Sequence, residues 1–255
     1  MNMPRITARQ EQMQALGRAG GLRLLFIGNS ATYVHDLPKT LSCLAAECGY
    51  HIEVKSIVKG GYELAQHADI YTERGRMAYD AIAEGYDAVF LQDNGNCVTT
   101  EEKSIASRNA CAALYRAITA AGSNAYIYVR PPYEYEHAGR TPLAQCVAFD
   151  ALFGEIAAEL GVLNAYVNRA FAYAMTRLDY DLWGPDHAHI SEHGAYLAVC
   201  VFFATLFGCS ATALGANGLP QKDVRALQQV ADLIAIDGVI PWTAEKKELK
   251  YDTEG

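Results

Sequence analysis

The sequence predicts an α/β fold: a three-layer α/β/α sandwich around a central, mostly parallel, five-stranded sheet. Short apolar runs alternate with longer stretches of helical periodicity, which is typical of successive β-α units. A glycine also follows four of the helical stretches and shortly precedes an apolar run, where a helix C-cap needs a left-handed residue: Gly49, Gly85, Gly122 and Gly161. Both patterns indicate the same alternation of strand and helix.

Each apolar run defines one expected strand, and the helical patterns fill the gaps between them. The strands are expected at Leu22–Ile27, Ile52–Ile57, Ala88–Gln92, Ala125–Val129 and Val162–Val167. The helices are expected at Pro38–Cys48, Leu64–Ala83, Glu101–Ala121, Pro142–Leu160, Glu192–Phe207 and Gln221–Ile234.

Length and composition indicate one globular domain spanning residues 1–255. The chain has 255 residues, of which 51% are hydrophobic and 20% charged, enough to bury one large core. That core is expected over about residues 22–207, with a C-terminal helix and a charged tail in residues 208–255. The net charge of -8 disfavours nucleic acid and anionic membranes as partners, because like charges repel.

The seven cysteines are expected to be reduced. They are odd in number, scattered, and never spaced as Cys-x-x-Cys, and most lie among apolar or small residues. The first 21 residues, "MNMPRITARQEQMQALGRAGG", contain no continuous apolar segment of the signal-peptide kind, and no later window is apolar for the length of a bilayer. We therefore expect a soluble, cytoplasmic protein without a membrane partner; the oligomeric state is left open.

Small polar residues follow the first three expected strands. Gly28-Asn29-Ser30 follows the first, Lys59-Gly60-Gly61-Tyr62 the second, and Asp93-Asn94-Gly95-Asn96 the third. In an open parallel sheet, ligands bind beyond the carboxyl ends of the strands. A serine at a strand-to-helix turn suits a nucleophile that forms an oxyanion, because its N–H and the helix dipole favour negative charge. A serine there can equally be a helix N-cap.

A second polar group precedes the long apolar helix, in "WGPDHAHISEHGAYL". Asp186 lies three residues before His189, and at this spacing a carboxylate can fix the tautomer of an imidazole whose other nitrogen faces a serine. The alternative is structural: Asp186 or Ser191 caps the helix that begins near Glu192.

Taken together, these segments resemble the SGNH hydrolase superfamily, also called GDSL esterases. The resemblance rests on "FIGNSATY" after the first strand, glycine after the second, asparagine after the third and "DHAH" before the last long helix, and it covers about residues 22–207. Gly-Asn-Ser replaces the usual Gly-Asp-Ser, and Gln92-Asp93-Asn94-Gly95 replaces the usual Gly-x-Asn-Asp. "GNSATYVHDLP" and "GGYELAQHA" are most similar to a poorly characterised bacterial branch in which Gly-Asn-Ser is normal.

The resemblance implies the SGNH hydrolase, flavodoxin-like variant of the fold and a serine esterase without a cofactor. Ser30 would be the nucleophile, His189 the general base and then acid, and Asp186 the carboxylate that orients His189. The oxyanion hole would comprise the Ser30 N–H, the N–H of Gly60 or Gly61, and the side chain of Asn94, for which Gln92 is the alternative amide.

Two other classes of function stay open from the sequence. A metal-dependent hydrolase would use the cluster of His187, His189 and His193, with His35 or His67 as a further ligand, although the helical His-Glu-x-x-His arrangement is absent. A non-catalytic ligand-binding module on the same scaffold is the other, because fold alone does not guarantee activity.

The substrate is expected to be a small ester with a short acyl group, and an acetylated sugar is the candidate. Four aromatic residues on loops at the expected site edge are the candidate substrate contacts: Tyr33, Tyr62, Tyr133 and Trp183. Together with neighbouring charged residues such as Glu134, they can stack on a sugar ring and bind its hydroxyls, or they can simply pack the loops.

Overall fold

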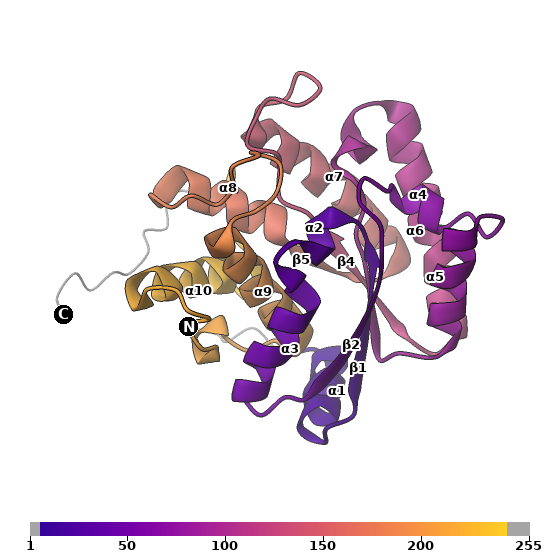
Figure 1. Ribbon diagram of the computed structural model, residues 1–255, viewed down its shortest axis with the longest axis horizontal. Helices are drawn as coiled ribbons and strands as arrows, with labels where there is room; N and C mark the ends of the chain where they lie inside the picture. The colour runs from indigo at the N-terminus through magenta and orange to yellow at the C-terminus, as the bar shows by residue number, and fades with distance from the viewer. Residues whose placement is uncertain (1–5, 244–255) are drawn as a thin grey trace.

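A computed structural model describes residues 6–243 of the chain. Over this range the sheet has five parallel strands in the order β2-β1-β3-β4-β5 (Figure 1). Their bounds are Leu22–Gly28 for β1, Ile52–Val58 for β2, Ala88–Leu91 for β3, Asn124–Val129 for β4 and Leu163–Tyr166 for β5. The predicted α/β class and all five predicted strands are confirmed, and no strand end differs from its predicted position by more than one residue.

Helices surround the sheet on both faces. Five of them lie at predicted positions: α3 at Leu37–Glu47, α6 at Glu101–Ala120, α7 at Pro142–Leu160, α9 at Glu192–Phe207 and α10 at Gln221–Ala235. Two short helices follow the polar turn after β1: α2 at Ser30–Tyr33 and the 3-10 helix η1 at Val34–Asp36. Two further 3-10 helices among the described residues are η2 at Gly95–Val98 and η3 at Ala211–Ala213.

Three features of the helices differ from the prediction. The expected helix Leu64–Ala83 is two helices, α4 at Leu64–His67 and α5 at Glu73–Ala83. The break is stabilised by Thr72, whose Oγ1 donates to the Asp69 carbonyl at 2.9 Å and accepts from the Gly75 N–H at 3.0 Å as the N-cap of α5.

The other two differences are helices that the periodicity did not indicate. The first, α1 at Ala8–Arg18, buries only Met13 and Gly17 and is stabilised at its start by a capping box between Thr7 and Gln10. The second, α8 at Val167–Arg177, continues directly from β5 without a side-chain cap, so no polar residue marks its beginning in the sequence.

Two hydrophobic cores lie between the sheet and the helices, one on each face of the sheet. Helices α1, α3, α8, α9 and α10 pack on one face of the sheet, and α4, α5, α6 and α7 pack on the other (Figure 1). Apolar residues surround α9 on all sides, so that this helix is buried along nearly its whole length between the sheet and its neighbours. Phe202 of α9 lies against Phe26, Phe90 and Tyr128 of the sheet, with ring centroids 4.8–5.9 Å apart.

The strand register brings the first three polar turns to one edge of the sheet. Gly28 pairs with Val58 of β2, and Ile27 pairs with Leu91 of β3. The turns that begin at residues 28, 59 and 92 therefore start side by side.

All seven cysteines are free, and no helix among the described residues has the length and apolar character to cross a membrane. The predicted C-terminal tail falls outside the described residues from 244 onward.

Candidate active site

The turn after β1 contains Ser30, which is the first residue of α2. Asn29 is the N-cap of this helix, and its Oδ1 accepts from the Ala31 N–H at 3.0 Å. Among residues 6–243 the Ser30 N–H has no hydrogen-bond acceptor. A Cβ atom on Gly28 would collide with Oε1 of Gln92, so glycine is required where this strand ends. Gly28 thus lets the Gln92 side chain lie close to the backbone, Asn29 caps α2, and Ser30 stands at the start of that helix.

The turn after β2 runs beside the first. The Lys59 N–H donates to the Gly28 carbonyl at 3.2 Å, and Gly61 has a φ of +72°, which favours glycine. Asn29 Nδ2 donates to the Tyr62 carbonyl at 2.8 Å, which joins the two turns. Within the described part of the chain, the N–H groups of Gly60 and Gly61 have no acceptor, so they remain available as donors.

The turn after β3 contains both candidate amides. Asn94 is 8% exposed; its Nδ2 donates to the Gly61 carbonyl at 3.0 Å, and its Oδ1 accepts from the Asn96 N–H at 3.0 Å. A primary amide carries two N–H donors, so one remains on Asn94. Gln92 differs from Asn94 in having no free N–H on its amide, because its Nε2 donates to both Asn29 Oδ1, at 3.1 Å, and the Asp93 carbonyl.

Asp186 and His189 form a pair in the loop before α9. His189 Nδ1 lies 2.5 Å from Asp186 Oδ2, and Asp186 Oδ1 accepts from the backbone N–H groups of Ala188 and His189. The side-chain hydrogen bond with His189, followed by the backbone N–H bonds, holds the pKa of Asp186 well below its ordinary value. An ionised Asp186 favours a proton on Nδ1 of His189, which leaves Nε2 as the acceptor.

Capping of α9 belongs to Ser191. Its Oγ accepts from the Gly194 N–H at 3.2 Å and donates to the Asp181 carbonyl at 2.5 Å. The sequence left Asp186 and Ser191 as alternative caps, and the structure assigns the cap to Ser191.

His35 joins the Ser30 segment to the loop that carries the Asp186–His189 pair. Its Nε2 donates to the Ile190 carbonyl at 2.9 Å, and its backbone has a φ of 59°, unusual for a residue other than glycine. Among the described residues, no hydrogen bond joins Ser30 Oγ to His189 Nε2. Sequence reasoning missed the hydrogen bond from His35 to the Ile190 carbonyl, since nothing in the sequence pairs these two residues.

The three histidines of the proposed metal cluster face three different carboxylates. His187 Nδ1 lies 2.7 Å from Glu134, His193 Nε2 lies 3.2 Å from Asp223, and His189 pairs with Asp186. The remaining metal candidate His67 is buried, with Nε2 donating to the Gly28 carbonyl at 2.8 Å. In residues 6–243 no three His, Cys, Asp or Glu side chains are grouped closely enough to hold a metal ion.

The four candidate substrate contacts occupy different parts of the site edge. Tyr33 is exposed, and its hydroxyl lies next to Gly60; the Tyr62 ring packs edge-on against His67. Tyr133 stacks on Tyr135 with centroids 5.2 Å apart. The guanidinium of the buried Arg130 lies 4.1 Å from the centroid of the Tyr133 ring.

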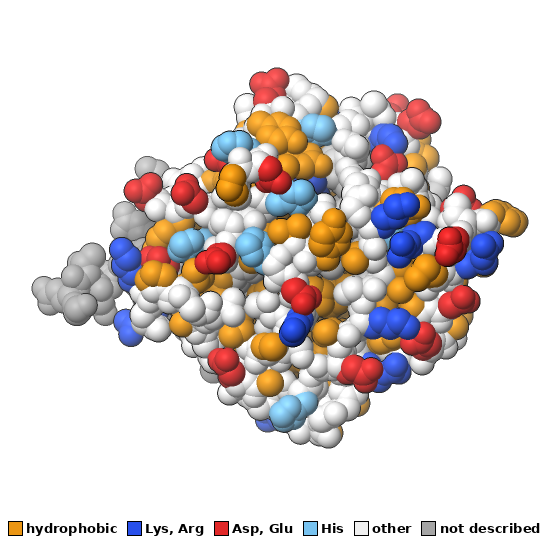
Figure 2. Space-filling model, in the orientation of Figure 1, with side chains coloured by type: hydrophobic (Ala, Val, Ile, Leu, Met, Phe, Trp, Pro, Cys, Tyr) orange, Lys and Arg blue, Asp and Glu red, His pale blue; other side chains and the backbone are white. Residues whose placement is uncertain are grey.

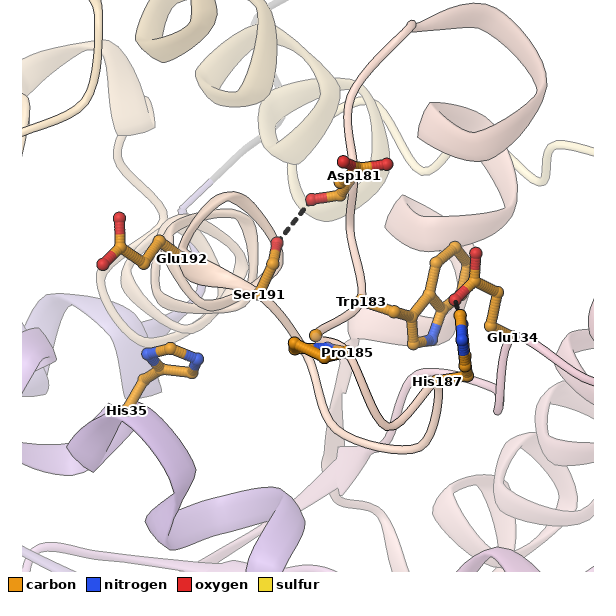
Figure 3. Close-up of a pocket in the computed structure, with 9 residues that line it drawn as sticks. His35, Glu134, Asp181, Trp183, Pro185, His187, Ser191 and Glu192 are labelled. Carbon is orange, nitrogen blue, oxygen red and sulfur yellow. Dashed lines mark hydrogen bonds and ion pairs between the residues drawn. The ribbon is translucent and has the colours of Figure 1, made fainter.

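Trp183 belongs to a hollow of about 520 Å³ beside the Asp186–His189 loop. It donates from Nε1 to the Pro132 carbonyl at 2.9 Å, and the backbone N–H of Glu134 donates to the His187 carbonyl at 3.0 Å. The hollow is lined by both charged and aromatic side chains: His35, Glu134, Asp181, Trp183, Gly184, Pro185, His187, Ser191 and Glu192 (Figure 3). Carboxylates and histidines are interspersed on this face of the molecule (Figure 2).

Comparisons with solved structures match most of the chain. A protein from Slackia heliotrinireducens, provisionally assigned to the SGNH hydrolases, is 28% identical, with a TM-score of 0.62 over 71% of this chain and 96% of its own. A DUF4886 family protein from Bacteroides uniformis is 17% identical, with a TM-score of 0.71 over 84% of this chain and 94% of its own.

The acetylxylan esterase Axe2 from Geobacillus stearothermophilus is 18% identical, with a TM-score of 0.56 over 75% of this chain and 96% of its own. At identities of 17% and 18%, the last two similarities concern the fold alone. No family model matches the chain, and no curated protein matches its sequence.

Proposed function

Because this chain belongs to the SGNH hydrolase superfamily, we propose that it is a serine esterase acting on short-chain acyl esters through Ser30, His189 and Asp186. The observation that carries the proposal is the Asp186–His189 pair, with its ionised carboxylate, on a loop that His35 joins to the Ser30 segment. This arrangement supplies a base whose free nitrogen can face the nucleophile.

In the proposed reaction, Ser30 Oγ attacks the ester carbonyl while His189 Nε2 takes the hydroxyl proton. The tetrahedral intermediate collapses to an acyl-enzyme, and His189 returns the proton to the leaving alcohol. Water then attacks the acyl-enzyme with His189 again as base, and the carboxylic acid leaves Ser30 regenerated. Asp186 stays ionised throughout and stabilises the imidazolium.

We assign the oxyanion hole to the N–H of Ser30, the N–H of Gly60 or Gly61, and Nδ2 of Asn94. The backbone groups have no other acceptor among the described residues, and Asn94 retains one N–H. Gln92 is not part of this assignment, because both of its N–H groups already have acceptors. A preorganised donor of this kind contributes about 3–4 kcal/mol to stabilisation of the transition state.

The proposed substrate is an acetyl ester, with an acetylated sugar as the alcohol part. Stacked Tyr133 and Tyr135, Trp183 and the nearby carboxylate of Glu134 are the side-chain types that bind sugar rings and hydroxyls. The fold is also shared with an acetylxylan esterase. Hydrolysis should be faster for acetyl than for octanoyl esters of p-nitrophenol; the reverse preference would contradict the short-acyl proposal.

Replacement of the nucleophile tests the mechanism. Ser30→Ala should abolish hydrolysis of p-nitrophenyl acetate and labelling by a fluorophosphonate, while the denaturation midpoint changes little. Ser104→Ala, at a half-buried serine on α6 outside the proposed site, is the matched control and should keep full activity. An active Ser30→Ala protein would rule out the proposed nucleophile.

Chelation separates this mechanism from metal-dependent hydrolysis. Because His187, His189 and His193 each pair with a different carboxylate, we expect activity to be unchanged by a chelator. Loss of activity on chelation, with recovery on addition of zinc, would favour the metal-dependent alternative.

A further inference from the structure

Gln92 occupies a position behind the turn that carries Ser30. It follows β3 directly, is 1% exposed, and reaches under Gly28 and Asn29. Its Oε1 accepts from the Asn29 N–H and from Thr32 Oγ1, both at 2.9 Å. Its Nε2 donates to Asn29 Oδ1 and to the Asp93 carbonyl. The amide has only one workable orientation, because the Asn29 N–H can only donate and the Asp93 carbonyl can only accept.

The Asn29 side-chain amide, like that of Gln92, both donates and accepts hydrogen bonds. It is 3% exposed; its Oδ1 accepts from the Ala31 N–H and from Gln92 Nε2, and its Nδ2 donates to the Tyr62 carbonyl at 2.8 Å. An aspartate at this position would keep both acceptor contacts. However, an ionised carboxylate would place a second oxygen against the Tyr62 carbonyl, where the amide now donates.

The Asn29–Gln92 pair connects all three turns of the proposed oxyanion hole. Gln92 belongs to the turn after β3, Asn29 immediately precedes Ser30, and the bond from Asn29 to Tyr62 holds the turn that carries Gly60 and Gly61. Asn94 closes the circuit by donating to the Gly61 carbonyl at 3.0 Å. A shift in either amide of the pair would therefore move backbone donors of two turns together.

We propose that Asn29 and Gln92 are positioning residues, a reciprocal amide pair that sets the N–H groups of Ser30 and the Gly60-Gly61 turn for oxyanion stabilisation. This inference rests on the proposed esterase function. It accounts together for Gly-Asn-Ser in place of Gly-Asp-Ser and for glutamine at the end of β3, because each amide satisfies the other. Both side chains are buried, Gln92 at 1% and Asn29 at 3% exposure.

Two substitutions disrupt the pair in different ways. Gln92→Met preserves approximate volume but leaves the Asn29 N–H without its acceptor; Asn29→Asp preserves shape but removes the donor to Tyr62. A displacement of about 1 Å in catalytic groups can cost about 100-fold in rate. Each variant should lower kcat for p-nitrophenyl acetate by about 10–100-fold, with KM changed less than about threefold, because the donors act mainly in the transition state.

Two controls separate positioning from general loss of stability. Gln228→Met removes another buried glutamine, 3% exposed on α10, which donates to Tyr196 Oη and to the Leu214 carbonyl. It should lower the denaturation midpoint while kcat stays near wild type. Thr32→Val removes one bond to Gln92 Oε1 but leaves the Asn29 contacts, so its kcat should change less than about threefold.

Amide hydrogen exchange measures the same effect without any assumption about the reaction. Peptides covering residues 28–33 and 59–63 should exchange faster in Gln92→Met and Asn29→Asp than in wild type, and at the wild-type rate in Gln228→Met. Unchanged exchange in both segments would overturn the positioning role whatever the activity. Faster exchange with wild-type kcat would overturn its catalytic importance, whereas a wild-type protein without Ser30-dependent hydrolysis would refute the esterase function alone.

Discussion

At the scale of single residues, Asn94 and Gln92 are two buried amides that lie two positions apart in one turn, and their hydrogen bonds separate their roles. Asn94→Ala should lower kcat by about 10²–10³-fold with little change in KM, because an oxyanion donor acts in the transition state. Steady-state kinetics on p-nitrophenyl acetate measure this effect. Asn168→Ala is the matched control, since Asn168 is a buried amide on α8 that donates to the Cys146 carbonyl; it should affect stability only. A wild-type kcat in Asn94→Ala would exclude Asn94 from the oxyanion hole.

Asp186 offers a second test at this scale. Its pKa is lowered in the folded protein, so its ionisation stabilises the fold above the unfolded value of about 3.9, and this contribution is lost as pH falls further toward the folded value. The side chain is 53% exposed, so the contribution is small. Asp186 therefore remains ionised through the neutral and mildly acidic range.

Asp186→Asn should lower kcat by about 10⁴-fold across that pH range, because His189 loses the partner that fixes its tautomer. A pH profile of kcat/KM for wild type and variant measures the effect. The second imidazole–carboxylate pair, His193 and Asp223, supplies the control: Asp223→Asn should leave kcat unchanged. A small loss in Asp186→Asn would mean that this carboxylate only shapes its loop.

At the scale of elements, Ser191, the N-cap of α9, lies two residues after His189. The capping residue and the proposed catalytic residue are close in sequence, but substitutions can separate their effects. Ser191→Ala should cost about 1 kcal/mol of unfolding free energy, because the Gly194 N–H loses its acceptor, while kcat changes less than about threefold. Urea denaturation and kinetics on the same preparation measure both. Thr100→Ala removes the equivalent cap of α6 and should cost a similar free energy. A loss of kcat comparable to that of Asp186→Asn would instead assign Ser191 to the mechanism.

At the scale of the whole molecule, α9 supports both the sheet and the loop that carries His189. Phe202 is fully buried where α9 crosses the aromatic rings of the sheet, so Phe202→Ala should lower the unfolding free energy by about 3–5 kcal/mol. Urea denaturation followed by far-UV circular dichroism measures the change. Ile105→Ala, at a side chain that is 51% exposed on α6, should change stability by less than about 0.5 kcal/mol. Equal effects of the two substitutions would contradict a core centred on α9.

The fold was predictable because its strands and most of its helices are apolar patterns of different period. The β1 and β3 runs are buried on both faces, α7 ends just before Gly161 as predicted, and α9 begins just after Ser191, one of its two candidate caps. The helices α1 and α8 were missed for local reasons. One buries too little surface to give a clear pattern, and the other begins without a capping side chain.

The sequence by itself determined the α/β class, the polar turns after three strands, and Ser30, Asp186 and His189 as candidate site residues, because these depend on local pattern and spacing. Asn94 became a candidate through the resemblance to SGNH hydrolases. Tertiary structure decided the partners. Ser191 rather than Asp186 caps α9, three histidines face three separate carboxylates, and Gln92 bonds to Asn29 across 63 positions of the chain. A buried amide or imidazole is committed by the donors and acceptors that distant segments bring to it, and a single sequence does not contain their positions.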